Sequence, residues 1–126
     1  MSGFKQLIVL LLMGVPVIGL TQPSQALLFI DSNNERQLEL VNKINKELQL
    51  SPTLNNGVNL EVIDIRGGME PRFSALRYRV DTNGEWVVKY KPRNLPWLIC
   101  SEQNMPHSGF SITQHDAIRR CLTAAP

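Results

Sequence analysis

The chain has 126 residues, of which 13 are basic and 11 acidic, so its net charge at neutral pH is +2. A charge this close to neutral excludes a strongly basic nucleic-acid-binding protein, so nucleic acid is not an expected partner. The length suits one domain with a real hydrophobic core. We therefore expect one small domain.

An export signal is predicted at the start of the chain. Lys5 precedes an uncharged run of 14 residues from Leu7 to Leu20. A membrane-spanning helix needs about 20 apolar residues, so this run is too short to cross comfortably. Ser24 and Ala26 then place small residues at the third and first positions before a cut, as signal peptidase requires. We predict cleavage after Ala26; the alternatives are an uncleaved anchor or a helix buried in the domain.

The predicted mature domain covers residues 27–126, after a signal peptide at 1–26. The signal contains one base and no acid, so the net charge of the mature chain is +1. No second long apolar run follows in the sequence, so the mature form is expected to have no transmembrane segment. We expect an exported protein in the periplasm, the extracellular space or an equivalent lumen.

The first predicted element of this domain is an amphipathic helix over residues 33–49. Ser32 and Glu35 form a capping box, in which each side chain can accept from the backbone amide of the other residue. Pro52 ends the helix. Its apolar stripe recurs at helical spacing and is expected to lie in the core: Leu40, Val41, Ile44 and Leu48.

A strand is predicted over residues 58–66, after the turn signal Asn55-Asn56-Gly57. Its apolar residues first follow one side of the strand and then switch to the other side at Ile63 and Ile65. The switch indicates either a β-bulge or a strand that is covered on both faces.

A β-hairpin is predicted from residues 73–81 and 85–91, with Thr82-Asn83-Gly84 as a three-residue loop. This loop length places Val80 opposite Trp86 and gathers the apolar residues of both strands on one face. A two-residue loop would divide them between the two faces, because a slip of one residue inverts every side chain. Gly84 then takes the left-handed conformation, which glycine adopts without a Cβ clash.

The C-terminal part predicts a short strand or buried plug over residues 97–100, a loop over 101–110 and a short helix with Thr113 as its N-cap. Cys100 and Cys121 are predicted to form a disulfide, because an isolated cysteine pair in an exported chain is usually oxidised. Two free thiols or a redox pair are the alternatives, although the spacing is not C-x-x-C. The expected fold is α+β: an N-terminal amphipathic helix, an antiparallel β-meander of three to four strands, a short C-terminal helix and one disulfide.

Six bases gather around the predicted hairpin. Its register puts four of them together on the solvent face, and two lie just beyond the strand ends: Arg77, Arg79, Lys89 and Lys91, then Arg72 and Arg93. A cationic face of this kind predicts binding to an acidic protein surface or to anionic lipid head groups. The alternative is a solvated face that keeps the sheet soluble and discourages edge pairing.

No catalytic, metal or cofactor motif stands out in the sequence. The two histidines, His107 and His115, are too few for a zinc site, which needs three or four ligands close together. We therefore expect no metal and no cofactor, and we predict a non-enzymatic binding or accessory protein of an extracytoplasmic assembly. The alternatives are a small secreted hydrolase that uses His107 or His115 and a secreted inhibitor that presents the 101–110 loop.

Overall fold

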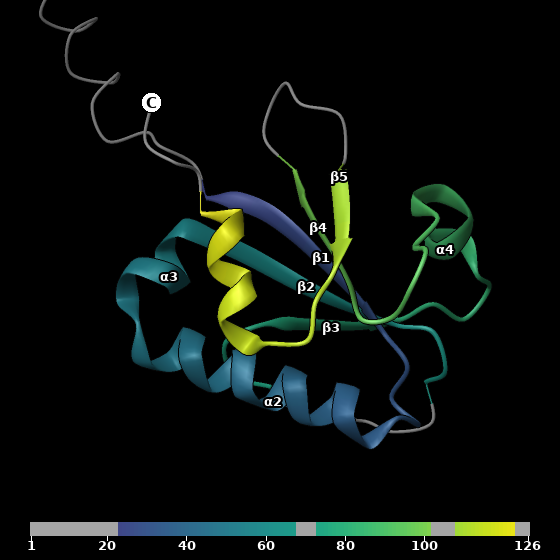
Figure 1. Ribbon diagram of the computed structural model, residues 1–126, viewed down its shortest axis with the longest axis horizontal. Coiled ribbons are helices and arrows are strands. Elements are labelled where there is room, and N and C mark those ends of the chain that lie inside the picture. The colour runs from purple at the N-terminus through teal and green to yellow at the C-terminus, as the bar shows by residue number, and fades with distance from the viewer. Residues whose placement is uncertain (1–22, 68–72, 102–107, 123–126) are drawn as a thin grey trace, which may run out of the picture.

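A computed structural model describes residues 23–67, 73–101 and 108–122 as a five-stranded sheet with helices on both faces (Figure 1). The elements in chain order are β1 (Ser24–Ile30), α2 (Glu35–Leu50), α3 (Pro52–Gly57), β2 (Val58–Asp64), β3 (Arg77–Val80), α4 (Glu85–Tyr90), β4 (Trp97–Ser101), β5 (Ser108–Ser111) and the 3-10 helix η1 (His115–Cys121). The predicted α+β class is confirmed.

The sheet is mixed, with the strand order β3-β2-β1-β4-β5. Strands β1, β2 and β3 run parallel, whereas β4 is antiparallel to β1 and β5 is antiparallel to β4. The expectation of a simple antiparallel meander was therefore wrong. The physical reason is α2, because a helix that connects two neighbouring strands crosses over the sheet and leaves them parallel.

Strand β1 is the central strand of the sheet, and it contains the predicted cleavage position after Ala26. Ala26 is 2% exposed and lies opposite Leu60 of β2 and Cys100 of β4. A cut after Ala26 would therefore remove the first three residues of β1 and keep the most buried part, Leu28 to Ile30.

We expect the exported protein to begin at Leu27, because Ser24 and Ala26 suit signal peptidase and the rest of β1 keeps its partners on both sides. N-terminal sequencing or the intact mass of exported material checks this. A first residue at or before Ser24 would contradict the predicted cut.

Helix α2 covers one face of the sheet and confirms the predicted apolar stripe. Its buried residues pack with α3 and η1 over β1 and β2, and we call this side of the sheet the α2 face. The predicted capping box was wrong: the N-cap is Asn34, whose side chain accepts from the backbone amides of Arg36 and Gln37 at 3.0 and 3.3 Å. Ser32 instead lies buried before the helix and donates its backbone amide to Asp64.

Strand β2 is covered on both faces, which is one of the two alternatives that the switch in its apolar pattern indicated. Leu60 and Val62 belong to the core under α2, whereas Ile63 packs on the opposite side with Phe29 and Ile99. The segment before it, predicted as a turn, is the short helix α3, because the Ser51 hydroxyl accepts from the Leu54 amide and starts a new helical turn.

The predicted hairpin was wrong. Only Arg77–Val80 forms a strand, it pairs in parallel with β2, and the second half of the expected hairpin is the helix α4. Gly84 does take the left-handed conformation, with φ of 72°, but it precedes a helix and not a second strand. Helix α4 packs on the sheet face opposite α2, which we call the α4 face, through Trp86 and Tyr90.

The C-terminal part confirms the predicted disulfide. Cys100 of β4 and Cys121 of η1 are bonded, with their Cα atoms 5.1 Å apart, so the last helix is fastened to the sheet. The short strand at 97–100 and the C-terminal helix are also present, although η1 has Gln114 as its N-cap position and no side-chain cap from Thr113. The predicted 101–110 loop was wrong at both ends, which belong to β4 and β5, and residues 102–107 lie outside the described residues.

Candidate functional site

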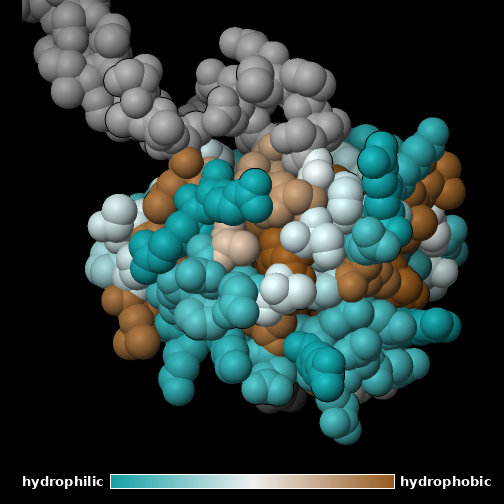
Figure 2. Space-filling view, viewed as in Figure 1, coloured by the Kyte–Doolittle hydropathy of each residue, from teal (hydrophilic) through white to brown (hydrophobic). Residues whose placement is uncertain are grey.

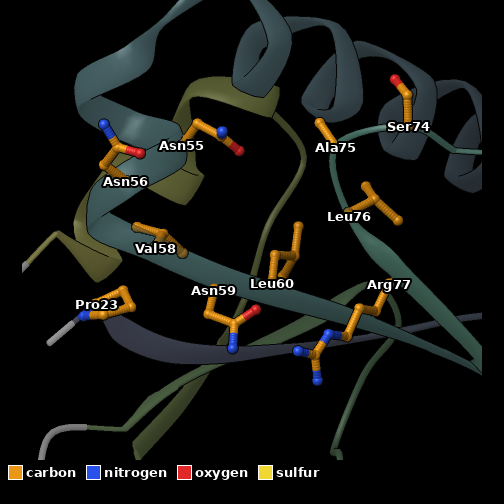
Figure 3. Close-up of a pocket in the computed structure, with 10 residues that line it drawn as sticks. All are labelled: Pro23, Asn55, Asn56, Val58, Asn59, Leu60, Ser74, Ala75, Leu76 and Arg77. Carbon is orange, nitrogen blue, oxygen red and sulfur yellow. The ribbon is translucent and has the colours of Figure 1, made fainter.

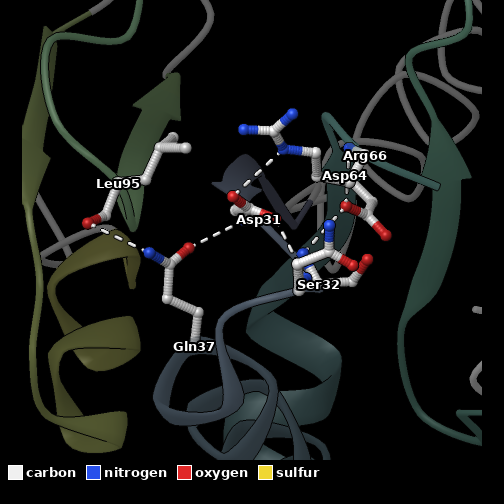
Figure 4. Close-up of polar contacts among 7 residues, drawn as sticks. Asp31, Ser32, Gln37, Asp64, Arg66 and Leu95 are labelled. Atoms are coloured by element: carbon white, nitrogen blue, oxygen red, sulfur yellow. Dashed lines mark hydrogen bonds and ion pairs between the residues drawn. The ribbon is translucent and has the colours of Figure 1, made fainter. Parts of the chain in front are cut away.

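The carboxyl ends of the parallel strands are the first place to look for a site, because ligands of open α/β sheets bind beyond these ends. Each of the three parallel strands brings an aspartate to this edge. Asp31 follows β1, Asp64 ends β2 and Asp81 follows β3. Figure 4 shows two of them, Asp31 and Asp64, among their polar partners.

Asp64 is fully buried at the end of β2. Its Oδ1 accepts from the backbone amides of Ser32 at 3.1 Å and Arg66 at 3.0 Å, and the Tyr78 hydroxyl donates to its Oδ2. Burial alone would raise the pKa of Asp64, but hydrogen bonds from Ser32, Tyr78 and the Arg66 backbone outweigh it and hold the pKa below its ordinary value of 3.8. The buried carboxylate therefore ties the loops after β1 and β2 to β3.

Asp31 and Gln37 fasten the loop after β1 to two neighbours (Figure 4). The Asp31 carboxylate accepts from the Asn33 amide at 2.9 Å and from Nε of Arg66 at 3.2 Å. The Gln37 side chain accepts from the Asp31 amide at 2.7 Å and donates to the carbonyl of Leu95, just before β4, at 3.5 Å. The start of α2 is thus bound to the loops that end β2 and begin β4.

Asp81 starts α4 in the same way. Its two carboxylate oxygens accept from the backbone amides of Trp86 and Val87 at 3.1 and 3.0 Å. All three edge carboxylates are therefore occupied by donors of the protein itself. Within the described ranges, no group of three potential metal-ligating side chains comes together. The edge is a rigid platform built from fastened loops.

The predicted basic residues do not form one hairpin face, because that hairpin does not exist. Arg77 and Arg79 do share a side of β3, and the register places both on the α4 face. Arg79 is held there: its Nε donates to Glu61 at 2.7 Å, and its guanidinium lies 5.0 Å from the centre of the Trp86 ring. Arg77 is exposed at the start of the strand. Arg72 lies outside the described residues.

The remaining predicted bases come from α4 and the loop after it. Lys89, Lys91 and Arg93 are exposed, and Lys91 ends the helix in the left-handed region with φ of 51°. The Lys89 ammonium lies 5.2 Å from the centre of the Tyr90 ring. Within the described part of the chain, none of these three bases forms an ion pair.

An exposed apolar side chain comes just before these bases in the sequence. Val88 of α4 is 71% exposed, and we call Val88, Lys89, Lys91 and Arg93 the α4 surface. Figure 2 shows apolar and hydrophilic atoms side by side at the right of the molecule, where Figure 1 places α4. Sequence reasoning missed Val88, because in the expected strand it alternated with Trp86 and Tyr90 and was placed toward the core.

The inner side of α4 is aromatic and holds the helix on the sheet. Trp86 stacks on Tyr90 with ring centroids 5.8 Å apart, and Tyr90 contacts Phe29 of β1 with centroids 6.0 Å apart. Helix α4 has only six residues, and its inner residues Trp86 and Tyr90 are half-buried. The α4 surface is therefore a small raised feature on an aromatic base.

His115 takes part in a side-chain cluster with Glu47 and Arg119. Its Nδ1 lies 2.7 Å from Oε2 of Glu47, whose other oxygen accepts from Nε of Arg119 at 2.8 Å. The cluster joins α2 to η1, and it includes no serine. The hydrolase alternative gains no support from this arrangement; His107 lies outside the described residues.

A pocket of about 500 Å³ lies between α3 and the start of β3 (Figure 3). Three asparagines, a serine and an arginine line it beside an apolar floor, and no histidine is among its lining residues: Asn55, Asn56, Asn59, Ser74 and Arg77, with Val58, Leu60, Ala75, Leu76 and Pro23. Sequence reasoning missed this pocket, because it depends on how β2 and β3 align.

No helix in the described ranges is both long and apolar enough to span a membrane.

The chain matches no protein-family model and no curated protein. Among solved structures, it is similar to the crystal structure of the pneumococcal exposed lipoprotein thioredoxin from Streptococcus pneumoniae strain TIGR4. The TM-score is 0.60 and the sequence identity 15%, over 82% of this chain and 85% of that chain. At this identity the likeness concerns the fold alone, and the fold of this chain is therefore thioredoxin-like.

Proposed function

We propose that this chain is an exported, non-enzymatic binding module that uses a thioredoxin-like fold to dock an acidic protein on its α4 surface. The observation that carries the proposal is the exposed Val88, which Lys89, Lys91 and Arg93 follow closely in the sequence. Within the described residues these cations have no carboxylate partner. Together with an exposed apolar residue they offer both apolar contact and charge complementarity to a partner.

Thiol–disulfide exchange is the activity that the fold likeness raises first, and the cysteines argue against it. Exchange needs an accessible thiolate, most often in a C-x-x-C motif or at a helix N-terminus. This chain has two cysteines, and both are used in the bond between β4 and η1, with Cys121 buried. At the start of α2 the sequence reads Asp31-Ser32-Asn33-Asn34. We therefore favour binding over redox chemistry.

An acidic protein fits the α4 surface better than an anionic membrane does. A membrane presents a continuous sheet of negative charge, which would also meet the exposed Glu85 in the first turn of α4. A protein partner can place its acidic residues opposite the bases and avoid Glu85. It can also cover Val88 with an apolar side chain, as the centre of a protein interface requires.

The experiment compares two triple variants of equal charge. The first replaces Lys89, Lys91 and Arg93 by Gln. The control replaces Arg36, Lys43 and Lys46, three exposed bases of α2 on the other face of the sheet, by Gln. The probe is a synthetic peptide in which glutamates alternate with valines and leucines, and binding is followed by the peptide's fluorescence anisotropy.

We expect the α4 variant to bind about tenfold more weakly, because three exposed charge contacts of some tenths of a kcal/mol each sum to about 1.4 kcal/mol. The control variant should bind like the wild type, and wild-type binding should weaken as salt rises. Equal loss in both variants would refute a specific surface. Binding to phosphatidylglycerol vesicles that exceeds binding to the peptide would assign the surface to lipid instead.

A further inference from the structure

The pocket between α3 and β3 lies where the sheet lacks a strand. In the parallel register, β3 begins with Arg77 opposite Glu61, so no residue of β3 lies opposite Val58, Asn59 or Leu60. The chain before β3, Ser74–Leu76, bends away and forms the far wall of the pocket. The pocket is therefore a slot in line with β3, beside the first three residues of β2 (Figure 3).

Backbone polar groups of β2 face this slot. Successive residues of a strand direct their backbone groups to opposite neighbours. At the end of β2, the carbonyl of Asp64 accepts from Asp81 on the β3 side, whereas the amide of Ile65 donates to Ile30 on the β1 side. The alternation therefore directs the Val58 carbonyl and the Leu60 amide toward the β3 side, which is the slot, whereas the Val58 amide donates to the Leu54 carbonyl of α3.

A cation lies at the end of the slot where β3 begins. Arg77 is exposed and lines the pocket, and in the described part of the chain its guanidinium has no hydrogen-bond or ion-pair partner. Arg66, Arg79 and Arg119, in contrast, each pair with a carboxylate. Figure 3 shows Asn55 and Asn56 of α3 at the opposite end of the slot from Arg77. The slot thus has a cationic end and an amide end.

We propose that the slot binds a short extended peptide that adds as a strand to β2, with its C-terminal carboxylate at Arg77. Main-chain hydrogen bonds to an exposed strand segment are the common basis of such strand addition. Three residues span about 10 Å in a strand, which matches the three uncovered residues of β2. A guanidinium can hold a terminal carboxylate with two parallel hydrogen bonds.

The proposal does not depend on the α4 surface, since the slot shares no residue with it. Pro23 is the one lining residue before the predicted cut after Ala26, and the other nine lie beyond the cut. The same cut would also remove Ser24–Ala26, which pair with Val58–Leu60 on the β1 side of β2.

The test uses the full exported protein, labelled with ¹⁵N, and titrates it with five probes. These are tri-alanine with a free carboxylate, its C-terminal amide, tri-alanine with one N-methylated peptide bond at either position, and acetate. We expect saturable shifts from tri-alanine at the amides of Asn59, Leu60 and Arg77. The amide probe should bind at least about fivefold more weakly, because it lacks the charge that Arg77 recognises.

N-methylation separates strand addition from simple carboxylate binding. Alternation predicts that methylation at one position removes a hydrogen bond to β2 and weakens binding, while methylation at the other leaves it unchanged. The variant Arg77→Gln should bind tri-alanine as weakly as the wild type binds the C-terminal amide. The control Arg36→Gln should bind tri-alanine as tightly as the wild type does. Acetate that binds as tightly as tri-alanine, equal effects of both methylations, or no saturable shift in the slot would overturn the proposal.

Discussion

Reduction of the Cys100–Cys121 disulfide is expected to lower the free energy of unfolding by about 3 kcal/mol. The bond closes a segment of 21 residues, and opening it gives the unfolded chain more conformations. In the folded state the bond joins β4 to η1, whose Ile118 and Cys121 complete the core under α2. Reduction should therefore lower the stability of the whole domain, and its effect should not be confined to an exposed loop.

Urea unfolding of the exported protein, with and without reductant, measures this difference. The double variant Cys100→Ala/Cys121→Ala is the control, because reductant should not change its unfolding midpoint. If reductant leaves the wild-type midpoint where it was, the disulfide adds no stability and this view of the C-terminal helix is wrong.

Replacing Asp64 by Asn is expected to destabilise the fold by about 2–4 kcal/mol at neutral pH. The buried carboxylate accepts from the amides of Ser32 and Arg66 and from the Tyr78 hydroxyl. An amide side chain has one acceptor oxygen, and its NH₂ group would face donors at a fully buried position. Asp116→Asn on the exposed side of η1 is the matched control, and it should unfold like the wild type.

Asp64 also predicts how stability depends on pH. Its pKa lies below the ordinary value of 3.8 in the folded state, so the unfolded chain binds the proton more tightly. The stabilisation from Asp64 is therefore complete above that ordinary value and is lost as pH falls toward the lower folded-state pKa. Urea midpoints measured from neutral pH down to acid should fall less steeply for Asp64→Asn than for wild type. Parallel curves would contradict this role.

The sequence predicts the parts of the fold that depend on local pattern. The apolar stripe of α2 follows from residues three and four apart, and the disulfide follows from an isolated cysteine pair in a chain that the sequence predicts to be exported. Both features need little knowledge of distant parts of the chain, and the structure confirms both.

Two elements could not be predicted because tertiary contacts decide them. Strand β1 is buried on both faces at Phe29 and Ile30, so its apolar residues show no alternation, and the predicted cut after Ala26 divides the strand between the predicted signal peptide and the predicted domain. Helix α4 has the aromatic and β-branched residues of a strand, but Asp81 holds its first amides and directs the chain into a helix.

The candidate surfaces also divide into features that local sequence predicts and features that tertiary contacts decide. Charge and the predicted hairpin together named Lys89, Lys91 and Arg93 among six bases; the hairpin was wrong, but these three bases are exposed in the structure. The exposure of Val88 could not be predicted, because a strand over residues 85–91 would have placed its side chain toward the core, whereas the helix α4 leaves it exposed. The slot at Arg77 depends on the offset between β2 and β3, which pair over four residues only and which no local pattern encodes.

The central claim, that the chain works by docking a partner at α4, is tested most directly by site-specific photo-cross-linking in the native envelope. Two exposed apolar positions make a matched pair: Val88 on α4, 71% exposed, and Leu50 at the end of α2, 77% exposed. A photoreactive residue at each is irradiated in the wild-type background and in the Lys89/Lys91/Arg93→Gln background. We predict that position 88 captures one protein, which mass spectrometry identifies as acidic, that the capture is lost in the triple variant, and that position 50 does not capture it. Capture of the same protein from both positions, or capture at 88 that persists in the triple variant, would contradict the claim.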